Sequence, residues 1–125
     1  NLVWSRYDSG DQDVIDGLHT IRLATRMMVD ALQRDHRQLV VDSLNEICKG
    51  VDLLDPSIHQ PFRDIIEPML ADGLVMAWKA LGAGGGGCVA LLCNPMSLNL
   101  VHSRLSELGW QIIDWEYDYC GLAEI

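Results

Sequence analysis

Apolar residues recur with helical spacing through the first half of the chain. After Asp13 they follow one another mostly every three or four residues, interrupted by the polar Thr25: Val14, Leu18, Ile21, Met28 and Leu32. A second series stops before Asp55-Pro56: Val40, Leu44, Ile47, Val51 and Leu54. Such spacing places apolar side chains along one face of a helix. The two segments therefore predict an antiparallel pair of helices.

Two further helices are predicted by prolines at their starts. Pro61 suits the first turn of a helix, and apolar residues follow it at Phe62, Ile65, Ile66, Met69 and Leu70. Asn94 and Pro95 supply an N-cap and a first-turn proline for the last helix, which Gly109 terminates. The apolar positions of that helix are Leu98, Val101, Leu105 and Leu108.

Four segments predict strands. Residues 74–81 and 88–93 are short, mostly apolar runs, and residues 110–118 alternate apolar and acidic side chains with the period of a half-buried strand. The mixed segment 2–7 comes before the turn-like DSGD of residues 8–11. The predicted order is β-α-α-α-β-β-α-β, an α+β, ferredoxin-like, split β-α-β sandwich. In it a four-stranded antiparallel sheet carries helices on one face, with extra helices in the first crossover.

The composition predicts a single globular domain over residues 1–125. Hydrophobic residues make up 49% and charged residues 22% of the chain, with a formal net charge of −9. This charge repels phosphate backbones and anionic lipid, so neither nucleic acid nor a membrane is an expected partner. No apolar run approaches the roughly 20 residues of a membrane span, and no signal peptide is visible. The four cysteines lack C-x-x-C spacing and are interpreted as reduced core thiols of a cytoplasmic protein.

The segment WKALGAGGGGCVALLC, residues 78–93, is the most unusual part of the sequence, because five of the six residues from Gly82 to Gly87 are glycine. A hairpin turn needs only one or two glycines. Consecutive N–H groups without Cβ atoms can also form a concave nest that binds an anion, to which Lys79 adds positive charge. The excess of glycine favours phosphate binding over a plain turn. The candidate cofactor-binding residues are Lys79, Gly82, Ala83, Gly84, Gly85, Gly86 and Gly87.

Other polar side chains give weaker indications. The four histidines are scattered, without the spacing of a metal site: His19, His36, His59 and His102. Asp114, Glu116 and Asp118 either coordinate a cation from one strand face or form the solvated face of that strand, and the second reading is favoured. Neither a metal ligand nor a catalytic residue is therefore assigned.

The stretch KALGAGGGGC resembles the third conserved motif of the GHMP kinases, the superfamily of galactokinase, homoserine kinase, mevalonate kinase and phosphomevalonate kinase. The ending DWEYDYCGL, residues 114–122, resembles the sugar-kinase and heptose-7-phosphate kinase branch. The resemblance implies a ferredoxin-like C-terminal domain whose glycines lie next to the nucleotide phosphates. It also implies ATP and Mg²⁺ as cofactors of the intact enzyme, an N-terminal kinase domain as partner, and a sugar or sugar phosphate as substrate.

Several features of that superfamily are not found in this chain. The main phosphate loop, the magnesium ligand and the catalytic aspartate of the superfamily belong to its N-terminal domain. We therefore expect the chain alone to be inactive and to bind no cofactor tightly. The TG-x-x-R element of sugar-kinase relatives is matched only by SGDQD, with Asp13 in place of the arginine.

The first residue is Asn1 rather than methionine, so we expect a piece of a longer protein. Removal of a partner domain would leave an apolar surface beside the glycines, so we expect either such an exposed patch or self-association of the isolated domain through it. The alternative function is a stand-alone ligand-binding or protein-interaction module that kept the fold.

Overall fold

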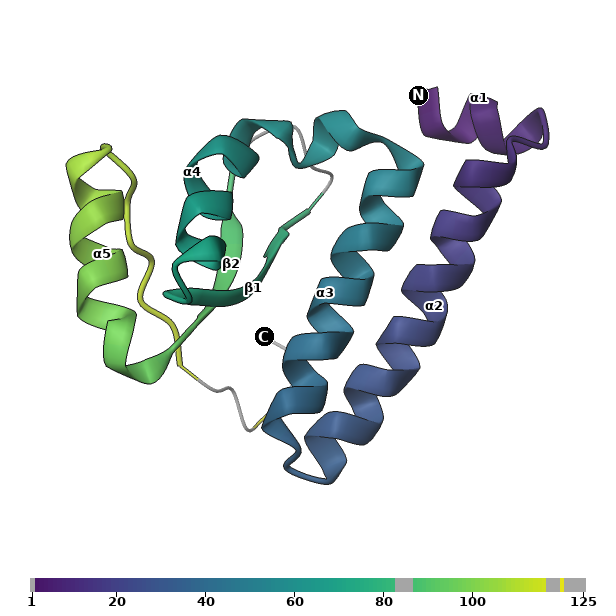
Figure 1. Ribbon diagram of the computed structural model, residues 1–125. Helices are drawn as coiled ribbons and strands as arrows, with labels where there is room; N and C mark the ends of the chain where they lie inside the picture. The colour runs from purple at the N-terminus through teal and green to yellow at the C-terminus, as the bar shows by residue number, and fades with distance from the viewer. Residues whose placement is uncertain (1, 83–86, 117–119, 121–125) are drawn as a thin grey trace.

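The protein consists of a long helical hairpin beside a smaller unit of helices and a β-hairpin (Figure 1). The structure is a computed structural model that describes residues 2–82, 87–116 and 120. The helices are α1 (Leu2–Asp8), α2 (Gln12–Gln33), α3 (Arg37–Leu54), α4 (Gln60–Ala71) and α5 (Leu98–Glu107), with short 3-10 helices η1 (Pro56–Ile58) and η2 (Pro95–Ser97). The strands are β1 (Val75–Ala80) and β2 (Val89–Cys93). None of the described helices is both long and apolar enough to cross a membrane.

Helices α2 and α3 pack closely because two glycines face each other at their crossing. A Cβ atom on Gly17 would lie 2.7 Å from the carbonyl oxygen of Gly50, and one on Gly50 would lie 2.7 Å from Cγ1 of Ile21. Both distances are well below van der Waals contact. The close approach therefore requires the absence of a side chain at both positions.

The strands β1 and β2 form an antiparallel hairpin in which Ala80 pairs with Val89. The ladder continues toward the connecting loop, where the Leu81 N–H donates to the Cys88 carbonyl at 2.9 Å. A core lies between this hairpin and the helices α4 and α5, and its buried members are Phe62, Ile66, Met69, Val75, Trp78, Ala80, Val101 and Leu105. Trp110 extends this core, because its ring meets that of Phe62 edge-on at 5.8 Å.

The structure confirms the helical pair, the two later helices and the two strands that flank the glycines. The predicted four-stranded ferredoxin-like sandwich is wrong, because the described residues form a sheet of only two strands. Residues 2–7 lie in helix α1, and residues 110–116 form neither helix nor strand. Residues 117 and 118 of the predicted last strand lie outside the described residues. A segment with alternating apolar and polar side chains forms a β-ladder only when a neighbouring strand pairs with it. The part of the chain that the structure describes offers no such strand to residues 110–116.

The close contact between α2 and α3 predicts that Gly17→Ala destabilises the protein. Alanine favours a helix over glycine by about 1 kcal/mol, but the new methyl group must push apart two backbones. We expect a net loss of about 1–3 kcal/mol in the free energy of unfolding, measured by urea denaturation. The control Arg26→Ala changes an exposed residue of the same helix and should stay within about 0.5 kcal/mol of wild type. A stabilised Gly17→Ala protein would contradict the close packing.

Candidate phosphate-binding loop and its buried support

The glycine loop, defined as residues 82–87, connects β1 to β2, so the predicted hairpin connection is confirmed. Its two described ends, Gly82 and Gly87, have φ angles of 74° and 88°. Only glycine adopts such angles without strain, which explains glycine at these two positions. Ala83, Gly84, Gly85 and Gly86 lie outside the described residues. The predicted role of the loop in phosphate binding stays a prediction.

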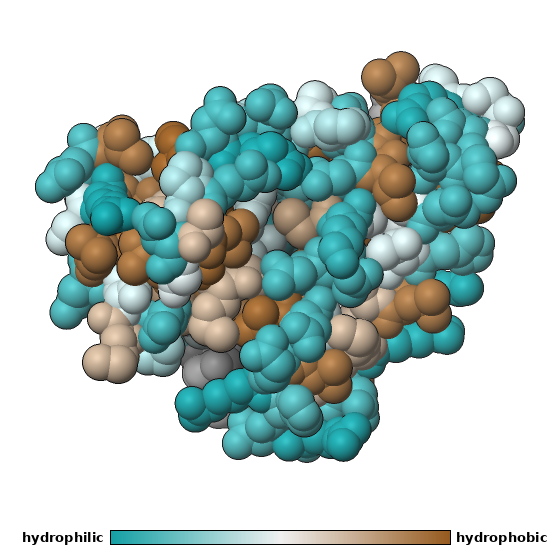
Figure 2. Space-filling view, in the orientation of Figure 1, coloured by the Kyte–Doolittle hydropathy of each residue, from teal (hydrophilic) through white to brown (hydrophobic). Residues whose placement is uncertain are grey.

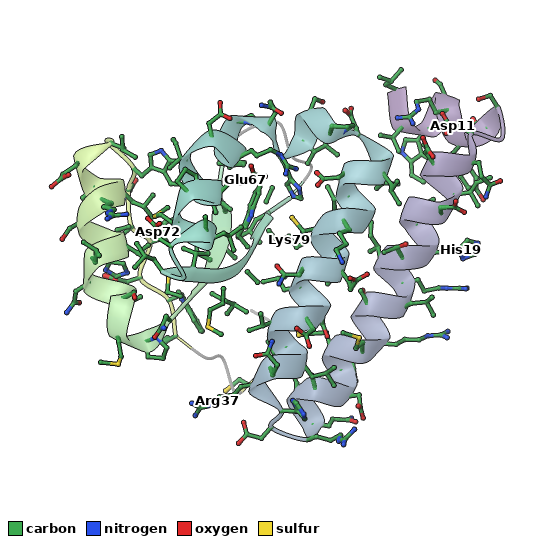
Figure 3. All side chains as sticks on the ribbon, in the orientation of Figure 1. Asp11, His19, Arg37, Glu67, Asp72 and Lys79 are labelled. Carbon is green, nitrogen blue, oxygen red and sulfur yellow. The ribbon has the colours of Figure 1, made fainter. Side chains whose placement is uncertain are left out.

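Lys79 lies on β1, on the side that faces α3 (Figure 3). Its ammonium group donates a hydrogen bond to the carbonyl oxygen of Ala80 at 2.8 Å. Lys79 and Gly82 also line a pocket of about 320 Å³, whose other lining residues are mostly apolar and include Trp4, Tyr7, Leu54 and Ile58. The positive charge predicted beside the glycines is thus present at the base of the loop, in an apolar setting.

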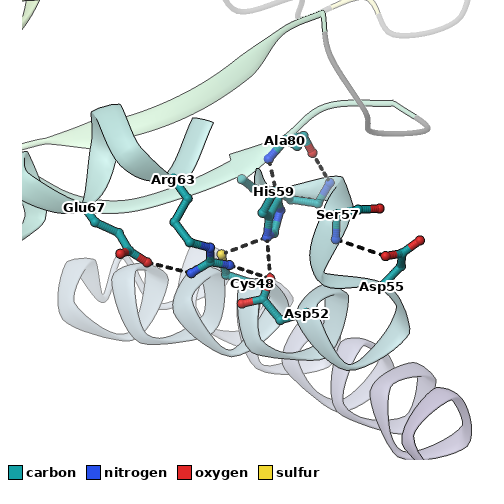
Figure 4. Close-up of polar contacts among 9 residues, drawn as sticks. Cys48, Asp52, Asp55, Ser57, His59, Arg63, Glu67 and Ala80 are labelled. Carbon is teal, nitrogen blue, oxygen red and sulfur yellow. Dashed lines mark hydrogen bonds and ion pairs between the residues drawn. The ribbon is translucent and has the colours of Figure 1, made fainter. Parts of the chain in front are cut away.

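A buried histidine lies directly beneath the end of β1 (Figure 4). The side chain of His59 is 0% exposed. Its Nδ1 lies 3.2 Å from Oδ1 of Asp52, and its Nε2 lies 3.5 Å from the backbone nitrogen of Ala80. The imidazole also packs on the ring of Trp78, with the ring centroids 4.6 Å apart. His59 therefore links α3, the start of α4 and the last residue of β1.

These contacts define the protonation state of the imidazole. The Ala80 N–H is a donor, so Nε2 must accept and the single ring proton must reside on Nδ1, where it donates to the Asp52 carboxylate. Burial lowers the pKa of His59 below its ordinary value, although the hydrogen bond and the charge of Asp52 act in the opposite direction. The structure thus favours neutral His59, protonated at Nδ1.

Arg63 fixes the carboxylate that holds the imidazole. Its Nη2 donates to Oδ1 of Asp52 at 2.6 Å, and its Nη1 donates to Glu67 at 2.6 Å. The guanidinium also lies 5.9 Å from the centre of the Trp78 ring, within the range of a cation–π contact. Asp52 is therefore held by Arg63 and accepts the hydrogen bond from the Nδ1–H group of His59. We call Cys48, Asp52, His59, Arg63 and Glu67 the His59 cluster.

Cys48, His59 and Asp52 are the residue types of a catalytic triad, but they are not arranged as one. The Cys48 sulfur lies 3.5 Å from Nδ1, the same nitrogen that contacts Asp52. A triad needs the nucleophile and the carboxylate on opposite ring nitrogens. Burial also raises the pKa of the Cys48 thiol to about 11, so the reactive thiolate is disfavoured.

The same three residues place possible metal ligands within 4.8 Å of one another. A cation there would have to compete with the Arg63 guanidinium for Asp52 and deprotonate the Cys48 thiol. Both requirements oppose metal binding. The geometry and charge of the cluster fit a hydrogen-bonded support better than a metal centre.

This cluster was not predicted from the sequence, because the hydrogen bonds that define it join side chains of different elements of the fold. His59 was judged as one of four scattered histidines, whereas its partners come from α3 and β1. The local signals were the pairs Arg63–Glu67 and Cys48–Asp52, each four residues apart, a spacing that places both members of a pair on one helix face. Nothing in the sequence indicated which histidine would meet that face.

The remaining candidate residues have structural roles or none. In the SGDQD segment, Asp11 caps α2, because its Oδ1 accepts from the backbone N–H groups of Asp13 and Val14 at 3.0 and 3.4 Å. Asp114 and Glu116 are exposed and lie outside any strand, and Asp118 lies outside the described residues. The cysteines are not all core thiols as predicted, since Cys88 and Cys120 are exposed.

Comparison with known proteins identifies the family of the chain. The family described as "GHMP kinases C terminal" matches residues 28–109, from the last turns of α2 to just beyond the end of α5. This match covers more than half of the sequence, and the chain therefore belongs to the GHMP kinases C-terminal family. The search of curated proteins and the search of solved structures gave no significant match. The resemblance to the GHMP superfamily is thus confirmed, and its sugar-kinase branch stays untested.

The lowered pKa of His59 predicts an acid-sensitive fold. At neutral pH the imidazole is uncharged in both the folded and the unfolded chain, so its contribution to stability is fully present. As the pH falls below the unfolded value of about 6.5, the unfolded chain takes up a proton that the folded chain resists. The free energy of unfolding should then fall by up to about 1.4 kcal/mol per pH unit from this group.

Urea denaturation between about pH 7.5 and about pH 5.5 measures this slope, above the range where carboxylates titrate. The variant His59→Gln carries no titrating group and should show a smaller slope over the same interval. An equal slope in wild type and His59→Gln would assign the acid sensitivity to other residues.

Proposed function

We propose that residues 1–125 form the C-terminal domain of an ATP-dependent, cytoplasmic GHMP kinase that phosphorylates a sugar or sugar phosphate. The observation that carries this proposal is the position of the glycine loop in a chain of the GHMP kinases C-terminal family. The loop joins two strands of a packed hairpin, with both described ends at positive φ. In the assembled enzyme it would lie beside the nucleotide phosphates.

The loop would contribute positioning and charge stabilisation to phosphoryl transfer. The chemistry depends on holding the nucleotide in line and neutralising the charge on its transferred phosphate. Backbone N–H groups from glycines approach phosphate closely because no Cβ atom intervenes, and they need no reorganisation during the reaction. Lys79 adds a positive charge at the base of the loop. None of the residues in this chain is assigned a direct catalytic role.

Membership in a C-terminal-domain family implies an N-terminal kinase domain as the partner in the full protein. That domain would supply the Mg²⁺ ligand and the main phosphate loop, so this chain alone would bind ATP and Mg²⁺ only weakly. The surface near the loop suits a docked partner. Leu81 is 47% exposed and Trp4, which lines the same pocket as Gly82, is 61% exposed. Apolar side chains also reach the surface over α1 and α2 (Figure 2).

The proposal predicts that Gly87→Val severely lowers turnover of the intact kinase. A branched side chain at this position both opposes the positive φ and blocks the approach of backbone to phosphate. The matched control is Gly109→Val, because Gly109 has a φ of 82° against 88° for Gly87, and neither position has an atom within 4 Å of an added Cβ. The two variants therefore carry similar backbone strain at different places.

We expect kcat/KM for ATP to fall at least about 100-fold in Gly87→Val and less than about threefold in Gly109→Val. Circular dichroism and the thermal midpoint of both variants report whether they fold. Wild-type turnover in a folded Gly87→Val enzyme would contradict phosphate binding by the glycine loop and leave the loop only the structural role of a turn. Absence of kinase turnover in the wild-type full-length protein would instead favour the stand-alone interaction module, which would use the apolar surface beside the loop.

A further inference from the structure

The backbone at the end of β1 has one N–H group that the β-hairpin cannot satisfy. In an antiparallel ladder, successive residues of a strand alternate between facing the neighbouring strand and facing away from it. The Leu81 N–H donates to Cys88 across the hairpin at 2.9 Å. The N–H of the preceding residue, Ala80, therefore points away from β2, toward the helices.

His59 is the group that meets this outward N–H, through its Nε2 at 3.5 Å. The outer edge of β1 is supported at a second point, where the side-chain amide of Asn45 donates to the Met76 carbonyl at 3.3 Å. Helix α3 therefore lies along this edge and contributes polar contacts at one end of the strand. The His59 contact lies at the other end, two residues before Gly82.

We propose that His59 is a positioning residue for the glycine loop, and that it acts by holding the end of β1 against α3 and α4. The proposal deepens the function proposed above and rests on it for the consequence in catalysis. The neutral imidazole accepts from Ala80 on one side and donates to Asp52 on the other. Arg63 and Glu67 hold Asp52 in turn. Ala80, the last residue of β1 before the loop, is thereby connected to α3 and α4.

The surroundings of the imidazole explain why a rigid, neutral group is required there. Asp52 and Cys48 face it from α3, Arg63 faces it from α4, and Lys79 lies nearby on β1. A flexible side chain in this space would lose more conformational freedom on ordering than the ring does. A permanently cationic side chain, such as lysine or arginine, could not accept from the Ala80 N–H.

Two substitutions of His59 distinguish the contact made by Nε2 from the contact made by Nδ1. The amide of glutamine reaches about as far as Nε2, so His59→Gln keeps an acceptor for Ala80. The shorter asparagine reaches about as far as Nδ1, so His59→Asn keeps the contact with Asp52 and loses the contact with Ala80. Both variants remove the aromatic ring, and general packing losses are therefore common to the pair.

The first measurement is amide hydrogen exchange followed by NMR. The quantity compared is the ratio of the exchange rate of the Ala80 amide to that of the Leu81 amide. Leu81 is the internal reference because its N–H is bonded within the hairpin, and global destabilisation accelerates both amides. We expect His59→Asn to raise this ratio at least about tenfold and His59→Gln to leave it within about threefold of wild type. Equal ratios in the two variants would overturn the role of Nε2 as the support of Ala80.

Turnover of the intact kinase gives the second measurement. His59→Asn should lower kcat/KM for ATP about tenfold relative to His59→Gln, because the loop is displaced. If the exchange ratio changes as expected and the two variants turn over equally, the positioning role is overturned while the phosphate-binding function stands. Failure of the phosphate-binding function itself would be recognised separately, by an active Gly87→Val enzyme.

Discussion

A buried imidazole is stable only when both of its nitrogens have partners, because an unpaired polar group inside a protein costs about 1–3 kcal/mol. His59 meets this requirement by joining an acceptor on α3 to a donor on β1. The contact at Nε2 also satisfies a backbone N–H that the hairpin leaves unpaired. The end of β1, the start of α4 and the carboxylate of Asp52 are therefore mutually dependent, and the position of the glycine loop follows from their arrangement.

The helical hairpin provides the rigid surface on which this arrangement rests. Gly17 and Gly50 let α2 and α3 approach to backbone contact. Helix α3 then presents Asn45, Cys48 and Asp52 toward β1 and α4. A side chain at either glycine would shift α3 relative to α2. The packing of two small residues far from the loop is thus connected to the polar contacts beneath it.

The parts of the fold that the sequence predicted are those with strong local signals. The apolar periodicity predicted the helices α2 to α5, and the apolar runs around the glycines predicted β1 and β2. The outer strands were mispredicted because a strand needs a partner, which periodicity does not reveal. In α1, Arg6 bonds to Asp11 at 2.8 Å and to the Leu54 carbonyl at 2.5 Å, a tertiary contact that favours the helix.

The candidate site likewise has one part that local sequence signals predicted and one part that they did not. The glycine loop and Lys79 were found from composition and spacing, whereas the His59 cluster required knowledge of which helix faces which strand. Its residues come from α3 and from α4 with its N-cap, and their types are common in ordinary surfaces. The chemistry of the cluster arises from burial and from hydrogen-bond direction. Neither can be read from the order of the residues.

The tautomer of His59 is the most direct test of this account. Nitrogen-15 NMR of the imidazole distinguishes a protonated ring nitrogen from a bare one and from the doubly protonated cation. At neutral pH we predict a neutral ring with the proton on Nδ1 and with Nε2 accepting from Ala80. A ring protonated at Nε2, or an imidazolium, would contradict the account, because either state places two donors face to face at the end of β1.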